Sequence, residues 1–172
     1  MRLVLPQQVH GYRVVRRCYL ADGPADGLWD YGSTARLGIR TADCIPVLLA
    51  TSTGYVAAIH AGWRGVVACI VERFLQRQLR FGREPKQWTV ALGPAAGGCC
   101  YQVGPEVCEA LGLIAEERYL DLRLLLAERL QQLGVGIIDF VGPCTICSKD
   151  GWASYRREGK QAGRNLAWIG VP

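Results

Sequence analysis

Histidine is scarce in this sequence, with only two residues, His10 and His60, among 172. Imidazole is the usual ligand of protein copper centres, and a multicopper oxidase needs roughly ten of them for its several sites. The histidine content therefore excludes that class of enzyme. It suffices for one small metal site.

Long apolar runs are also missing. No stretch approaches the roughly 18 consecutive apolar residues that indicate a membrane-spanning helix, so we expect no membrane partner. Residues 1–10 lack the charged leader, apolar core and cleavage site of a secretory signal. We therefore expect a cytoplasmic protein whose eight cysteines are free, buried or metal-bound and do not form a disulfide framework.

The residues that are present indicate a globular protein. Apolar residues make up 50% of the chain and charged residues 20%, which excludes a disordered tail or a fibrous repeat. A length of 172 residues is typical of one domain, so we expect residues 1–172 to form a single catalytic domain. The net charge of +5 fits either a solvated surface or a site for a small anionic substrate. We expect no nucleic-acid partner, and either a monomer or a homodimer.

Apolar patterning predicts a hairpin and a helix in the middle of the chain. Two short apolar runs, 45–50 and 55–60, flank the turn at 51–54, which is typical of paired buried strands. Apolar residues at helical spacing predict one helix over 65–79. Residues 1–43, in contrast, are punctuated by glycines and indicate a turn-rich segment.

The second half of the chain adds further elements. We expect strands over 88–92, 137–141 and 166–171, a short helix from Pro105, and a helix over 121–133 that begins at an Asp121 N-cap and ends at Gly134. Strands and helices do not alternate strictly. This favours an α+β fold with mixed sheets over a doubly wound fold.

Three metal-capable side chains stand beside predicted turns or strand ends: His10, Cys44 and His60. Two imidazoles and one thiolate make three ligands for Zn²⁺, the number that a catalytic zinc site uses while it keeps one position open. Two other interpretations stay open. The residues form either a structural pair of histidines with a buried thiol, or a cysteine hydrolase with Cys44 as nucleophile and His60 as base.

Two basic segments could bind an anion. The glycine-rich stretch 62–65 opens the predicted helix, and a helix N-terminus with the forked cation of Arg64 suits phosphate. The alternative is a capped helix with Trp63 in the core. Near the C-terminus, Arg156 and Arg164 belong to a basic cluster that is either solvated or the second wall of an anion pocket.

Four further cysteines lie in the adjacent pair Cys99 and Cys100 and in the CxxC segment 144–147. They could form a four-thiolate zinc site or a redox pair. Because adjacent cysteines chelate one ion poorly and no thioredoxin-like pattern surrounds the CxxC, we favour buried small apolar residues.

The motifs taken in order resemble the YfiH/DUF152 family, also called the laccase-domain or multicopper polyphenol oxidase family and described as purine nucleoside phosphorylases. The matching pieces are QVHG (8–11), ADGL (25–28), RTADCIPVLLA (40–50), HAGWRG (60–65), GP…CCYQVG (93–104), LDL (120–122), CT (144–145), SYRR (154–157) and GR (163–164). Two departures are visible. Only seven residues precede QVHG, which is short for the family, and Trp29 and Asp30 follow ADGL in place of valine and threonine.

The resemblance implies an α+β sandwich with mixed sheets flanked by helices, as in certain toxin deamidase domains. It implies His10, Cys44 and His60 as metal ligands, with zinc as the expected metal and copper as the other candidate. It also implies phosphorolysis of adenosine, inosine and 5′-methylthioadenosine, with adenosine deamination as a side activity. In that chemistry Arg64, Arg156 and Arg164 would bind substrate, and Asp43 is a candidate acid for the leaving purine. An inactive family member is the remaining alternative.

Overall fold

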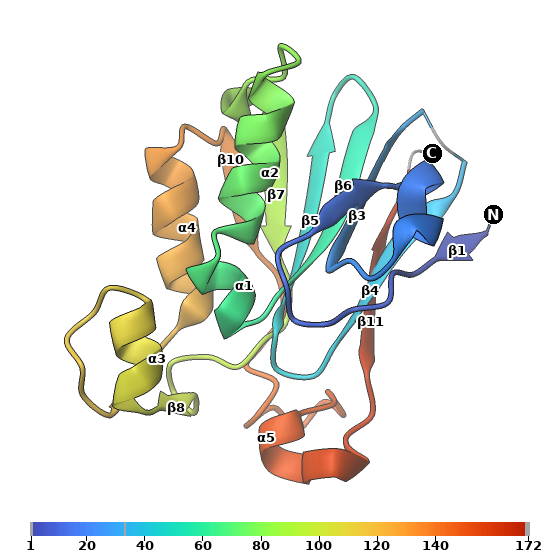
Figure 1. Cartoon of the computed structure of the whole chain (residues 1–172). Helices are drawn as coiled ribbons and strands as arrows, with labels where there is room; N and C mark the ends of the chain where they lie inside the picture. Colours follow the sequence, from blue (N-terminus) through green and yellow to red (C-terminus); the bar gives the residue numbers. More distant parts are fainter. Residues whose placement is uncertain (1, 33, 171–172) are drawn as a thin grey trace.

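The computed structural model describes residues 2–32 and 34–170, which form two packed β-sheets with helices over the outer face of the larger sheet (Figure 1). The larger sheet has six strands in the order β10 (Ile137–Phe140), β7 (Trp88–Leu92), β5 (Ile45–Thr51), β6 (Tyr55–Ala61), β3 (Gly27–Tyr31) and β2 (Val14–Arg16). The smaller sheet has the order β1 (Leu3–Val4), β4 (Arg36–Thr41) and β11 (Asn165–Ile169). Both sheets mix parallel and antiparallel pairs. The predicted α+β sandwich with mixed sheets is confirmed.

The central hairpin of β5 and β6 contributes side chains to two hydrophobic cores, one under the helices and one between the sheets. This is possible because side chains alternate between the faces of a strand. Val47 and Leu49 pack toward the helices, whereas Leu48 faces the smaller sheet. On β6, Ile59 joins the helix-side core and Ala58 joins the core between the sheets. Strands buried on both faces read as continuous apolar runs, which is why the sequence predicts this hairpin correctly.

The helices are short. Those that contribute to the core on the outer face of the larger sheet are α1 (Trp63–Val67), α2 (Ile70–Leu79), α3 (Pro105–Ala110) and α4 (Leu122–Gln132), whereas α5 (Tyr155–Glu158) lies at the end of the sandwich (Figure 1). The Asp121 carboxylate caps α4 by accepting hydrogen bonds from two backbone N–H groups, and Gly134 follows that helix with φ +87°. Short 3₁₀ segments at Arg17–Asp22, Pro85–Gln87 and Gly159–Gln161 and a small hairpin of β8 (Gln102–Val103) and β9 (Arg118–Tyr119) complete the elements.

Two predictions on secondary structure are wrong. The predicted helix over 65–79 is broken between α1 and α2 at Cys69, whose φ of 55° is left-handed. Apolar spacing continues across this break, so periodicity gave no sign of it. The turn-rich segment 1–43 contains four strands, β1 to β4. Of the strand expected over 166–171, residues 166–169 lie in β11 and Val171 lies outside the described residues.

None of the helices in the described part of the chain has the length and apolar character needed to cross a bilayer.

Candidate metal centre and substrate cavity

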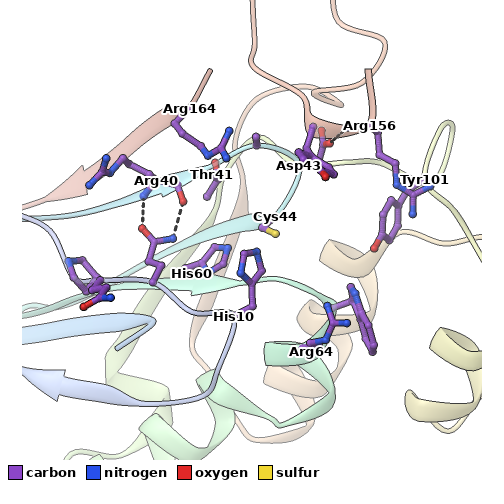
Figure 2. Close-up of a pocket in the computed structure, with 16 residues that line it drawn as sticks. His10, Arg40, Thr41, Asp43, Cys44, His60, Arg64, Tyr101, Arg156 and Arg164 are labelled. Carbon is purple, nitrogen blue, oxygen red and sulfur yellow. Dashed lines mark hydrogen bonds between the residues drawn. The ribbon is translucent and has the colours of Figure 1, made fainter. Parts of the chain in front are cut away.

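Two connecting loops and strand β6 bring His10, Cys44 and His60 together (Figure 2). Cys44 directly precedes β5, and His60 lies on the paired strand β6 next to Ala61, the partner of Ile45. His10 lies in the connection between β1 and β2 with a left-handed φ of 59°. One ligand atom of each side chain lies within 4.8 Å of the others. The two imidazoles meet edge to face, with ring centroids 4.8 Å apart.

A buried carboxylate, Asp26, organises both histidines. One of its oxygens lies 2.8 Å from His60 Nδ1 and accepts the backbone N–H of His10 at 2.8 Å. The other oxygen accepts the backbone N–H groups of Val9 and Gly11. Because Nδ1 of His60 is engaged, its Nε2 is the nitrogen left for Cys44 or a metal ion.

Gly62 lets the three side chains approach one another. A Cβ at this position would lie 3.0 Å from Cys44 Sγ and 3.4 Å from His10 Cδ2. The backbone at Gly62 is extended, with φ −76°, so any residue could adopt its conformation. Space beside the thiol is therefore the reason for glycine here.

Mutual hydrogen bonding shifts the protonation of these groups. Burial raises the pKa of Cys44, but hydrogen bonds to His10 and His60 outweigh it and lower the pKa to about 7. Burial lowers the pKa of His60, but the contacts with Asp26 and Cys44 outweigh it and raise the pKa to about 9. The resulting pair of thiolate and imidazolium offers an anionic sulfur, the form that binds metals and attacks electrophiles.

The three side chains lie at a cavity of about 760 Å³. Its lining residues are Pro6, Gln7, Gln8, His10, Arg40, Thr41, Ala42, Asp43, Cys44, His60, Trp63, Arg64, Tyr101, Tyr155, Arg156 and Arg164. Four of these are arginines, and one is a carboxylate. A cavity of this size accommodates a nucleoside-sized ligand, and the excess of cations favours an anionic one.

Asp43 uses both carboxylate oxygens to fasten loops around the cavity. It accepts the Thr145 hydroxyl at 2.7 Å and the backbone N–H of Arg156 at 2.7 Å. Its own backbone is left-handed, with φ 83°. This geometry gives Asp43 a positioning role for α5, and its role as an acid stays a prediction.

The three arginines expected from the sequence all reach the cavity but differ in their contacts. The Arg64 guanidinium stacks on the ring of Trp63 at 4.3 Å. Arg156 stacks on Tyr101 at 4.9 Å and donates to the carbonyl of Gln102. Arg164 donates to two neighbouring carbonyls.

The anion site expected at a helix start needs one correction. Arg64 belongs to α1, a helix of only five residues, because the chain breaks at Cys69. A helix this short adds little dipole, so any anion binding here depends on the Arg64 side chain. Trp63 is half-buried against the main core, so the packing role considered for it also holds.

Sequence reasoning missed three residues of this site. Asp26 lies in the ADGL segment, Arg40 begins the RTADC segment, and Tyr101 follows the adjacent cysteines, but no role was assigned to any of them. The side-chain amide of Gln8 forms two hydrogen bonds with the backbone of Arg40 (Figure 2). It donates to the Arg40 carbonyl and accepts the Arg40 N–H. Their motif positions were visible, but their roles depend on tertiary contacts.

Comparison with known proteins finds several relatives called purine nucleoside phosphorylase. This chain is 35% identical to the one from Deinococcus radiodurans, a match over 96% of this chain and 68% of the relative. It is 32% identical to that of Aquifex aeolicus, over 91% and 77% of the two chains. It is 33% identical to the purine nucleoside phosphorylase YfiH of Escherichia coli K12, over 95% and 71%.

Solved structures agree with these sequences. A DUF152 protein of Neisseria meningitidis superposes with a TM-score of 0.87 at 28% identity, over 99% of this chain and 75% of the other. YlmD of Geobacillus stearothermophilus gives 0.88 at 30% identity, over 98% and 73%. The family model described as multi-copper polyphenol oxidoreductase laccase matches residues 1–172. The resemblance inferred from the motifs is confirmed, and the chain belongs to the YfiH/DUF152 laccase-domain family.

Proposed function

We propose that this protein is a purine nucleoside phosphorylase that acts on adenosine, inosine and 5′-methylthioadenosine, with adenosine deamination as a side activity. The observation that carries the proposal is the juxtaposition of a His–Cys–His donor set with an arginine-lined cavity of about 760 Å³. The names of the relatives support the phosphorylase part of this proposal.

His10, Cys44 and His60 fit a metal ion, with zinc the expected one and copper the other candidate. Their ligand atoms converge within 4.8 Å, and Asp26 orients His60 in the manner of a carboxylate behind a metal-binding imidazole. Two imidazoles and a thiolate suit zinc or copper better than the oxygen-seeking Mg²⁺ or Ca²⁺. When bound, the ion would supply Lewis acidity at the cavity wall.

The arginines would bind the second substrate, phosphate. In phosphorolysis an oxygen of phosphate forms a bond to C1′ of the ribose, while the bond from C1′ to the purine nitrogen breaks and its electron pair leaves with the base. Arg64 offers its guanidinium from α1, and Arg156 and Arg164 offer theirs from the C-terminal segment. Forked contacts to phosphate fix its orientation as well as its charge.

The departing purine takes up a proton, and Tyr101 is suited to deliver it. Burial raises the pKa of Tyr101, the nearby charges of Cys44 and Asp43 act in the same direction, and Arg156 opposes them. The phenol therefore stays protonated at neutral pH and can donate to a purine nitrogen. Asp43, the candidate from sequence, has both oxygens engaged by Thr145 and Arg156.

A cysteine hydrolase is the second candidate, and one observation favours it. Asp26, His60 and Cys44 are arranged as carboxylate, imidazole and thiol, the order of a nucleophilic triad. A triad requires one imidazole beside the sulfur, whereas here His10 is a second one. The second imidazole favours the metal site.

The experiment that tests the proposal follows adenine and ribose 1-phosphate from adenosine, with and without phosphate, on protein of measured metal content. We expect adenine release that depends on phosphate and about one metal ion at the His–Cys–His site. Inosine formed without phosphate would report the deaminase activity. A protein without metal at the His–Cys–His centre and without phosphate-dependent turnover, inactivated by alkylation of Cys44, would instead support the hydrolase.

A further inference from the structure

A second cluster of metal-capable side chains lies apart from the His–Cys–His centre. Cys99 and Cys100 follow β7, and Cys144 and Cys147 follow β10. Strands β7 and β10 are parallel neighbours, so the loops after them leave the same edge of the sheet, and Ala95 bridges to Cys144. The four sulfur atoms lie within 4.8 Å of one another. The expectation that these cysteines are buried apolar residues is wrong, since Cys99 and Cys147 are exposed and the other two partly exposed.

The spacing of the sulfurs suits one tetrahedral ion. Four thiolates at about 2.3 Å from zinc stand roughly 3.8 Å apart along each edge of the tetrahedron. The distance from Cys99 Sγ to Cys147 Sγ is 3.7 Å. A disulfide would instead require sulfurs at about 2.05 Å.

A backbone hydrogen bond favours the anionic form of Cys144. Its Sγ accepts the backbone N–H of Gly97 at 3.2 Å. A hydrogen bond donated to sulfur stabilises a thiolate, the form that binds metals. The Gly97 N–H thus links the loop after β7 to the first cysteine of the 144–147 turn.

We propose that Cys99, Cys100, Cys144 and Cys147 bind a structural Zn²⁺ ion that joins the loops after β7 and β10. Four protein ligands leave no open position, which is the arrangement of structural and not catalytic zinc. Binding replaces the four thiol protons by the metal, so protons are released to solvent and no redox partner is needed. An all-sulfur donor set excludes hard cations such as Mg²⁺ and Ca²⁺.

The proposed zinc site adjoins residues that form the wall of the substrate cavity. Cys100 is followed by Tyr101, which lines the substrate cavity, and Cys144 is followed by Thr145, which donates to Asp43. Arg157 of α5 donates to the carbonyls of Thr145 and Ile146. The ion would therefore brace the cavity wall formed by Tyr101, Asp43 and α5.

The test counts zinc in protein that lacks the first metal centre. In the His10→Ala variant, purified under reducing conditions with zinc present, we expect about one tightly held ion per chain. Adding Cys147→Ser to this background should remove that ion, whereas adding Cys18→Ser, at an exposed cysteine elsewhere in the chain, should leave it. Co²⁺ in place of zinc should give the thiolate charge-transfer absorption of an all-sulfur site.

A second measurement uses the wild-type protein, so it does not depend on whether the variants fold. With zinc bound, the four cysteines should resist N-ethylmaleimide while Cys18 reacts, and removal of zinc should expose all four. A folded His10→Ala variant without zinc would overturn the proposal. So would equal alkylation of the four cysteines and Cys18 in zinc-loaded protein.

Discussion

The carboxylate of Asp26 lies 2.8 Å from Nδ1 of His60, with both side chains buried, and the same carboxylate holds the backbone of the loop that carries His10. One residue thus orients one imidazole and holds the backbone that carries the other. It joins the N-terminal loop, with its exposed His10, to the buried strand β6.

Replacement of Asp26 by asparagine should weaken metal binding without removing a ligand. Loss of a carboxylate behind a metal-binding histidine typically costs about 10- to 100-fold in affinity. We expect a loss of zinc affinity in this range, measured by competition with a chelator. Burial raises the pKa of Asp26, but hydrogen bonds from His60 and the backbone outweigh it and keep the pKa below its usual value, so the wild-type side chain is charged at neutral pH.

The matched control for that variant is Asp30→Asn. Asp30 is also buried, on the adjoining strand β3, and pairs with Arg16 and Arg17. This change should lower the thermal stability but leave the zinc affinity unchanged. Equal zinc affinity in the Asp26→Asn protein and the wild type would contradict the role of Asp26.

Arg64→Ala should separate phosphate handling from metal binding. Loss of a charge-assisted contact worth about 1.5–3 kcal/mol corresponds to roughly 10- to 150-fold lower turnover at sub-saturating phosphate. Metal content should stay the same, and deamination of adenosine should change much less. His60→Ala should lose the ion of the His–Cys–His centre and both activities, and Arg73→Ala, on α2 outside this cavity, should change neither. Unaltered phosphate dependence in the Arg64→Ala protein would make Arg64 a structural residue.

The sequence predicts some strands and misses others, because a glycine can mark a turn or a close contact between layers. The β5–β6 hairpin is predictable because its apolar runs flank a plain turn. The strands β3 and β4 were missed because Gly27 and Gly38 suggested turns. In the structure both serve close packing: a Cβ on Gly27 would meet Ile59 at 3.0 Å, and one on Gly38 would meet Leu5 at 2.8 Å. A glycine required by a neighbouring layer looks the same in sequence as one required by a turn.

The site was predictable only where side-chain chemistry alone suffices. His10, Cys44 and His60 were candidate donors because few side chains bind metals, and the family resemblance implied them as one set of ligands. Asp26, which directly precedes β3, was missed because it accepts backbone N–H groups from residues 9–11, a loop distant from it in the sequence. Sequence spacing argues against the grouping of the four cysteines, since their proximity depends on the parallel pairing of β7 with β10.

The reactivity of Cys44 in metal-free protein should titrate near neutral pH. Its pKa is lowered to about 7 from the usual value near 9 for this thiol, so alkylation by iodoacetamide should rise with a midpoint near pH 7. The rate is measured from the mass of the peptide that contains Cys44. His60→Ala should move the midpoint upward, because the imidazole that stabilises the thiolate is gone. Zinc should suppress labelling at all these pH values, and a wild-type midpoint near pH 9 would contradict the geometry.

Glu72 should make the fold less stable as the pH rises. Burial raises its pKa, and Arg129, with Nη1 at 3.9 Å from Oε1, offsets this only in part. A raised folded pKa means that the native state holds more protons than the unfolded state, so stability declines from the ordinary glutamate pKa up to the folded one. Glu72→Gln should therefore be more stable than wild type at pH 8, by on the order of 1 kcal/mol, with a smaller gain near pH 4.

The comparison for Glu72 is Glu128→Gln, at an exposed glutamate of helix α4. Urea unfolding of both variants at the two pH values measures the effect, and the control should stay within about 0.5 kcal/mol of wild type. A Glu72→Gln protein that loses stability at pH 8 would show that the pair with Arg129 outweighs the cost of burying the charge.

Gly62→Ala should disturb the metal centre through space alone. The added methyl would lie 3.0 Å from Cys44 Sγ, so the thiol or the loop of His10 has to move, while the extended backbone accepts alanine without strain. Overpacking of this kind costs about 1–3 kcal/mol, and we expect it to appear as weaker zinc binding in a chelator competition. Gly163→Ala is the matched control, because its methyl would make an ordinary contact of 3.6 Å with Ala153. Unchanged zinc affinity in the Gly62→Ala protein would mean that His10 and Cys44 do not converge on one ion.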